Sequence, residues 1–104
     1  MENLTSRHQA RARAPGSAAQ ALVGVVASGN LEVLAERVLE GTDCEVAIAT
    51  TAPGFGDVWA AVVADFVERR SPGGIRMSIN DGGARPDTVA LRLAQAARAL
   101  EEGR

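Results

Sequence analysis

The chain has 104 residues, of which 46% are hydrophobic and 23% charged, and its formal net charge is −2. This composition predicts one small globular domain. A nearly neutral chain has no field of one sign, so binding to nucleic acid or to a membrane surface is not expected. The single cysteine, Cys44, excludes an internal disulfide and a cysteine-based zinc site, and it favours a reducing, cytoplasmic setting.

Residues 1–18 are polar and rich in Arg, and Pro15 and Gly16 interrupt them. They show neither helical nor strand periodicity. No continuous apolar segment occurs before residue 21, so a secretory signal is not expected. We therefore predict a flexible N-terminal tail over residues 1–18 and a single domain over residues 19–104.

Three short apolar runs after the tail predict three strands. The first run covers residues 20–27, and the second begins at Leu31 and continues to about Leu39. Between them stands Ser28-Gly29-Asn30, a set of turn residues, so the two runs predict a β-hairpin. The third run, residues 44–51, alternates between apolar and other positions as a strand does.

The period of the apolar positions then changes, and it predicts a helix over residues 57–70 with Trp59 and Phe66 in the core. Residues 75–80 alternate again and predict a fourth strand. A last helix is expected to begin at Pro86, because proline suits the first helical position, and to end at Gly103.

The predicted order is β-β-β-α-β-α, and it predicts an α/β fold of the two-layer α+β kind. We expect a mostly antiparallel or mixed four-stranded sheet with two helices on one face. The strand at 44–51, the helix after it and the strand at 75–80 predict a right-handed crossover that joins parallel neighbours.

Few residues suit catalysis or metal binding. The only histidine, His8, falls in the predicted tail, so a buried Ser-His-Asp or Cys-His set is not expected. Cys44 lies between Asp43 and Glu45, whose carboxylates raise the pKa of a thiol, and we interpret it as a small core residue. The chain on its own is therefore not predicted to be an enzyme.

Two blocks of the sequence resemble the acyl-carrier (delta) subunits of malonate decarboxylase. Residues 22–34 read LVGVVASGNLEVL, and residues 78–84 read SINDGGA, followed by Pro86 and by Leu-Arg-Leu. The acyl-carrier (gamma) subunit of citrate lyase is a more distant relative of that family. The chain departs from the family pattern at Asn30, where we expect Asp, and at Arg85, where Thr is more usual.

The resemblance implies that Ser28 carries 2′-(5″-phosphoribosyl)-3′-dephospho-CoA through a phosphodiester, with Gly29 and Asn30 shaping the loop. The thiol of this group would carry acetyl and malonyl groups for a bacterial enzyme complex. The implied partners are the transferase and decarboxylase subunits of malonate decarboxylase, a malonyl transferase, and the prosthetic-group transferase that attaches the group.

Two alternatives remain open. The chain could be the carrier subunit of a citrate-lyase-type complex, or an unmodified scaffold or regulatory subunit. A stand-alone enzyme is disfavoured because the catalytic residues are missing. The carrier interpretation expects Ser28 at a protruding hairpin tip, within reach of several partner proteins.

Overall fold

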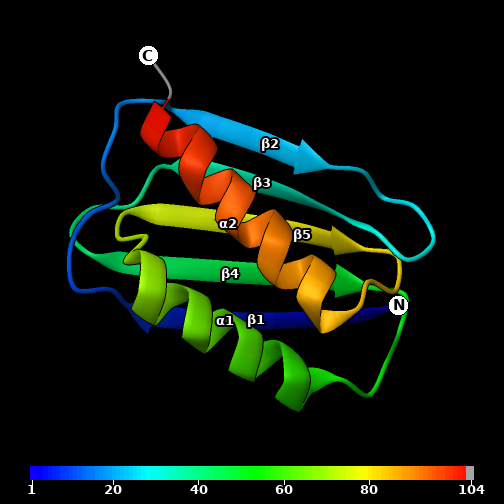
Figure 1. Cartoon of the computed structure of the whole chain (residues 1–104). Helices are drawn as coiled ribbons and strands as arrows, with labels where there is room; N and C mark the ends of the chain where they lie inside the picture. Colours follow the sequence, from blue (N-terminus) through cyan, green and yellow to red (C-terminus); the bar gives the residue numbers. More distant parts are fainter. Residues whose placement is uncertain (103–104) are drawn as a thin grey trace.

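The computed structural model describes residues 1–102 as one sheet covered by two helices (Figure 1). Its strands and helices in chain order are β1 (Glu2–Gln9), β2 (Gln20–Gly24), β3 (Leu31–Arg37), β4 (Asp43–Thr50), α1 (Gly56–Arg70), β5 (Ile75–Asp81) and α2 (Pro86–Glu102). The predicted stop of the last helix at Gly103 lies outside the described residues. None of the helices in the described range is long and apolar enough to cross a membrane.

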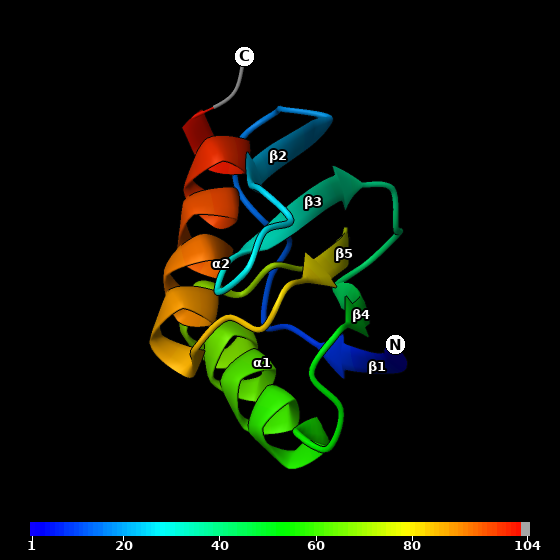
Figure 2. The same ribbon diagram turned by 90° about the vertical axis from the view of Figure 1, so that its right-hand side faces the viewer.

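The strand order across the sheet is β1-β4-β5-β3-β2. β4 and β5 are parallel neighbours joined through α1, as the sequence predicts, and the other three pairs are antiparallel. Both helices lie on one face of the sheet, which an edge-on view makes plain (Figure 2). The α+β fold class is therefore confirmed, with one strand more among the described residues than the four that were expected.

The core fills the space between the sheet and the helices. Strand side chains alternate, so that every second residue of β4 and β5, and of β3 up to Ala35, points to the helices and is buried. Trp59 and Phe66 lie in this core as predicted. The largest fully buried side chains belong to Leu31, Ile75, Met77, Ile79, Leu93 and Leu100.

The prediction of an unstructured tail over residues 1–18 is wrong for residues 2–9, which form β1 at one edge of the sheet. β1 pairs with β4 over its whole length, from Glu2 opposite Thr50 to Gln9 opposite Asp43. The apolar pattern misses this strand because Leu4 is its only large apolar residue and most of its other side chains are polar. An edge strand is half exposed and tolerates such a polar sequence.

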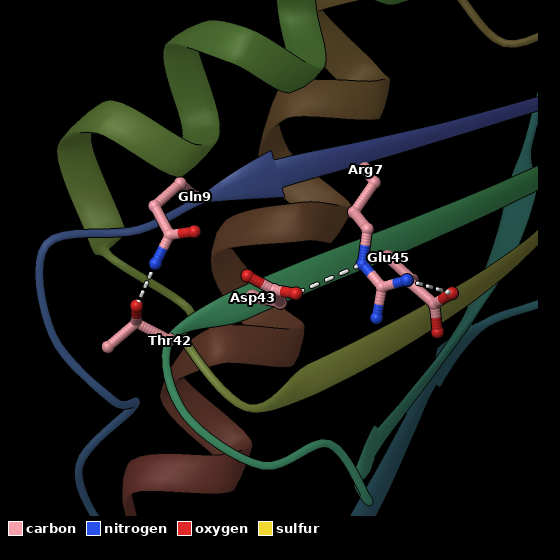
Figure 3. A network of polar contacts seen from close by, with 5 residues as sticks. All are labelled: Arg7, Gln9, Thr42, Asp43 and Glu45. Carbon is pink, nitrogen blue, oxygen red and sulfur yellow. Dashed lines mark hydrogen bonds and ion pairs between the residues drawn. The ribbon is translucent and has the colours of Figure 1, made fainter.

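Polar contacts join β1 to the start of β4 (Figure 3). The Arg7 guanidinium lies 3.1 Å from the Asp43 carboxylate and 3.6 Å from that of Glu45. The Gln9 amide donates to the Thr42 hydroxyl. Because these side chains are exposed or half-exposed, each pair adds at most about 1 kcal/mol, and the pairs agree with the register of the two strands.

The rest of the segment that was expected to be a tail connects the two edges of the sheet. It runs from β1 to β2 along the end of the sheet at which β1 finishes (Figure 1). The backbone amides of Arg11 and Ala12 donate to the Ser71 hydroxyl at 3.0 and 2.9 Å, and the Ala14 amide donates to the Gly73 carbonyl at 2.8 Å. The segment is thus tied to the residues that follow α1.

Cys44 is buried in the core, as the sequence predicts. Burial is the main reason that the pKa of its thiol rises from 9.0 to about 11, and the neighbouring Glu45 carboxylate adds to the rise. The sequence interpretation attributed a raised pKa of this thiol to the carboxylates of Asp43 and Glu45 alone; in the structure burial is the larger cause and Glu45 the contributing carboxylate. His8 lies in β1 rather than in a tail, and its Nε2 atom is 2.8 Å from the Ser6 hydroxyl.

Candidate functional site

The three predicted site residues, Ser28, Gly29 and Asn30, lie together in the loop between β2 and β3. β2 ends at Gly24, three residues earlier than the predicted strand, which extended to residue 27. Gly24 has a φ of +78°, and a Cβ atom there would lie 2.1 Å from the Leu31 carbonyl oxygen. Only glycine fits this position, and its unusual backbone conformation ends the strand early.

A tight turn forms the tip of the loop. The Asn30 amide donates to the Ala27 carbonyl at 2.9 Å, so Ser28 and Gly29 occupy the two central positions. Gly29 has a φ of +74°, and no atom lies within 4 Å of where its Cβ would be. The space next to Gly29 is therefore open, and its positive φ suits a glycine at this position of the turn.

Ser28 itself is exposed. Among residues 1–102 no hydrogen-bond partner of its hydroxyl is found. Val25 and Val26, three and two residues earlier, are also exposed, at 54% and 49%. The loop therefore presents an exposed hydroxyl and two exposed apolar side chains.

The side chain of Asn30 fixes the loop to the body of the protein. Its Oδ1 atom accepts a hydrogen bond from the Leu31 amide at 2.8 Å and another from Nε of Arg92 at 3.2 Å. Arg92 lies on α2 and also donates to Gln95 at 2.9 Å. Sequence reasoning missed this use of Arg92, because a contact across 62 positions leaves no local signal.

The loop also rests on the residues that follow β5. The Gly29 amide donates to the Gly82 carbonyl at 3.1 Å, and the Gly82 amide donates to the Asn30 carbonyl at 2.9 Å. A Cβ atom on Gly82 would lie 2.2 Å from the Ala27 carbonyl oxygen, so the close approach requires glycine. The two sequence blocks that carry the family resemblance thus meet at the serine loop.

Asp81 holds the turn after β5 in place, and it is only 3% exposed. Its carboxylate accepts hydrogen bonds from the Thr50 hydroxyl at 2.7 Å and from the amides of Gly83 and Ala84 at 3.0 and 2.9 Å. A buried carboxylate needs such partners. Asp81 therefore has a structural role, which positions Gly82 under the serine loop.

The serine loop and the C-terminal end of β1, where His8 lies, are at opposite ends of the sheet (Figure 1). The structure thus keeps the histidine away from Ser28. Within residues 1–102 no group of three His, Cys, Asp or Glu side chains could hold a metal ion. A firmly held loop with a free hydroxyl suits a domain of the carrier class, which presents a group to other proteins.

Comparisons with known proteins agree with this class. The family model for the malonate decarboxylase delta subunit (MdcD) matches residues 18–100. A malonate decarboxylase acyl carrier protein of Bradyrhizobium diazoefficiens is 65% identical over 102 residues, which cover 98% of this chain and 97% of the relative. One from Xanthomonas campestris pv. campestris is 52% identical over 101 residues, covering 97% and 96%.

A solved structure is similar as well. One chain of a Pseudomonas malonate decarboxylase hetero-tetramer, solved in complex with malonate, superimposes with a TM-score of 0.84 at 32% identity. The match covers 96% of this chain and 99% of that one. The chain therefore belongs to the malonate decarboxylase delta subunit family, the acyl carrier proteins of that enzyme.

Proposed function

We propose that this chain is the acyl-carrier subunit of a malonate decarboxylase, and that it carries acetyl and malonyl groups on a prosthetic group attached to Ser28. The group would be 2′-(5″-phosphoribosyl)-3′-dephospho-CoA, joined to the Ser28 Oγ atom through a phosphodiester. The observation that supports this best is the free, exposed hydroxyl of Ser28 on a loop that is otherwise held by hydrogen bonds on both sides.

The residues present suit such an attachment. Gly29 leaves the approach to the hydroxyl open, and Asn30 keeps the turn in one conformation through Arg92. The Arg92 guanidinium also puts a positive charge close to the loop, where a phosphodiester would carry a negative one. Ser28 needs no base of its own, because the attaching transferase can remove its proton.

The attached group would supply a thiol, whose thioester carbonyl can accept the negative charge left when CO₂ departs. The part of this chain is to hold the group, to expose it and to bring it to other subunits. A tethered acyl group meets its catalysts at a far higher local concentration than a free one.

The partners that we propose are the transferase and decarboxylase subunits of malonate decarboxylase, a malonyl transferase and the prosthetic-group transferase. A similar chain is part of a hetero-tetramer, which supports a multi-subunit assembly here. Val25 and Val26 would lie at these contacts, because both are exposed and stand three and two residues before Ser28. We further propose a cytoplasmic location, in keeping with the single reduced cysteine.

The intact mass of the protein tests the attachment. We expect protein purified from its native host, or co-expressed with the attaching enzymes, to show an added mass equal to the prosthetic group. A Ser28→Ala variant should lack the addition, while Ser6→Ala, which changes an exposed serine on β1, should keep it. An unmodified native protein would favour the scaffold or regulatory alternative.

A further inference from the structure

A cavity of about 310 Å³ opens between the first turns of the two helices. Val58, Trp59 and Val62 of α1 line one side, and Pro86 and Val89 of α2 line the other. Val58 is 41% exposed, so the cavity opens to solvent rather than being sealed in the core. A mostly apolar lining and a volume of this size are typical of a site for a small organic group.

The cavity lies next to the loop that carries Ser28. Gly82 exchanges backbone hydrogen bonds with that loop, and the residues directly after it, from Gly83 to Arg85, line the cavity. Figure 2 shows the loop between β2 and β3, in cyan, beside the connection that leads from β5 into α2. One short turn of chain therefore separates the proposed attachment point from the mouth of the cavity.

From the serine loop to the interior of the cavity, the protein surface changes from positively charged to apolar. A CoA-type arm changes in a matching order. Such an arm is anionic where it is attached and apolar towards its thiol. Here the Arg92 guanidinium lies at the serine loop, the exposed Arg85 side chain lies at the cavity, and apolar side chains line the interior. The Asp81 carboxylate adds no unpaired acceptor, because its oxygens already accept three hydrogen bonds.

We propose that the cavity between α1 and α2 receives the thiol end of the arm, free or as its acetyl thioester, while no partner subunit holds it. This inference rests on the attachment to Ser28. A bound acyl end is shielded from water and from stray nucleophiles, and it covers the apolar side chains that the free cavity exposes. The tether favours the arm over any free ligand, because the arm's local concentration near the cavity is high.

The reactivity of the arm's thiol towards a disulfide reagent tests the proposal. The mass of the loaded protein is measured first, to establish the adduct on Ser28. The apo protein supplies the baseline, because Cys44 is buried and its thiol has a raised pKa. If the thiol end occupies the cavity for about nine-tenths of the time, it reacts about tenfold more slowly than a free thiol.

Two matched variants sharpen the test. Val62→Phe fills the cavity and should restore the thiol to the rate of a free one. Val38→Phe makes the same change at an exposed position in the connection between β3 and β4 and should leave the protection intact. Trp59 gives a second reading that needs no variant, because it is the chain's only tryptophan and lines the cavity. Its indole NMR signals should differ between apo and acetyl-loaded protein.

The outcomes separate the two claims. If the adduct is on Ser28 but the thiol reacts at the free rate in all three proteins and the Trp59 signals do not change, the cavity does not hold the arm. The attachment would then still stand. If no adduct forms on Ser28, both claims fall. If Val62→Phe does not fold, the comparison of Trp59 signals in the unaltered protein decides.

Discussion

The Arg92 guanidinium on α2 donates a hydrogen bond to the side-chain oxygen of Asn30, 3.2 Å away and 62 positions earlier in the chain. This bond joins the last helix to the loop that presents Ser28. The same oxygen accepts the Leu31 amide, so a single side chain fixes the turn both locally and across the fold. The conformation of the serine loop therefore depends on Arg92, a residue outside the loop.

Replacing Arg92 by Gln should loosen the serine loop without unfolding the protein. We expect a loss of about 1 kcal/mol in the free energy of unfolding, since one partly exposed hydrogen bond is removed. A local loss of that size should speed hydrogen exchange at the Asn30 amide by about fivefold. Attachment of the prosthetic group should also slow, measured as the rate at which the added mass appears.

Two control variants belong to that experiment. Arg98→Gln removes an exposed arginine of α2 that pairs with Glu102, so loop exchange should not change. Asn30→Asp keeps the acceptor and pairs it with the Arg92 cation, so the loop should remain ordered. Equal exchange rates in the Arg92→Gln variant and the unaltered protein would show that the bond does not hold the loop.

Gly82→Ala should be strongly destabilising, because the new Cβ would lie 2.2 Å from the Ala27 carbonyl oxygen. The backbone of the serine loop must then move, at a cost of about 2 kcal/mol or more. Gly83→Ala is the matched control: it has a φ of +96° but open space around it, so it should cost only about 1 kcal/mol. Urea unfolding of both variants measures the difference, and equal losses would argue against the close packing.

Leu4→Ala tests whether β1 belongs to the folded domain. Leu4 is half-buried and packs against the core, so we expect a loss of about 1–2 kcal/mol in the free energy of unfolding. Its neighbour Thr5 is exposed on the same strand, and Thr5→Ala should change stability by less than about 0.5 kcal/mol. If Leu4→Ala left stability unchanged, residues 2–9 would be a dispensable tail after all.

Stability should fall between pH 9 and pH 11 because of Cys44. Its thiol has a pKa of 9.0 when exposed and about 11 in the folded protein, so above pH 9 the unfolded chain loses its proton first. The stabilisation is full below pH 9 and is lost as the pH rises through 11, by up to about 3 kcal/mol.

The composition allows the change in stability between pH 9 and pH 11 to be assigned to one side chain. The chain has no Tyr, and all of its basic side chains other than His8 are Arg, so Cys44 is the only side chain that titrates in this range. Cys44→Ala should therefore remove the slope of unfolding free energy against pH, although it lowers stability overall. A slope that persists in this variant would assign the effect to another group.

The sequence predicted those strands, helices and turns whose signals lie in neighbouring residues of the chain. The hairpin around Ser28 follows from a glycine-containing turn between two apolar runs, and the parallel pair of β4 and β5 follows from a strand, a helix and a strand in succession. Burial of Cys44 and Trp59 followed from periodicity in the same way.

The features that were missed depend on contacts between distant parts of the chain. β1 has a polar sequence with only Leu4 as a large apolar residue, and its partner β4 lies more than thirty positions later. The bond from Arg92 to Asn30 and the fit of Gly82 under Ala27 need three-dimensional packing to become visible. No periodicity or turn signal in the sequence encodes such pairs.

Locating the adduct within the chain tests the central claim most directly. Cleavage after Arg13 and Arg37 releases residues 14–37, a peptide that contains both Ser17 and Ser28. Fragmentation of this peptide from the loaded native protein should place the whole added mass of the CoA-derived group on Ser28. An added mass on Ser17, or a native peptide without any addition, would contradict the account.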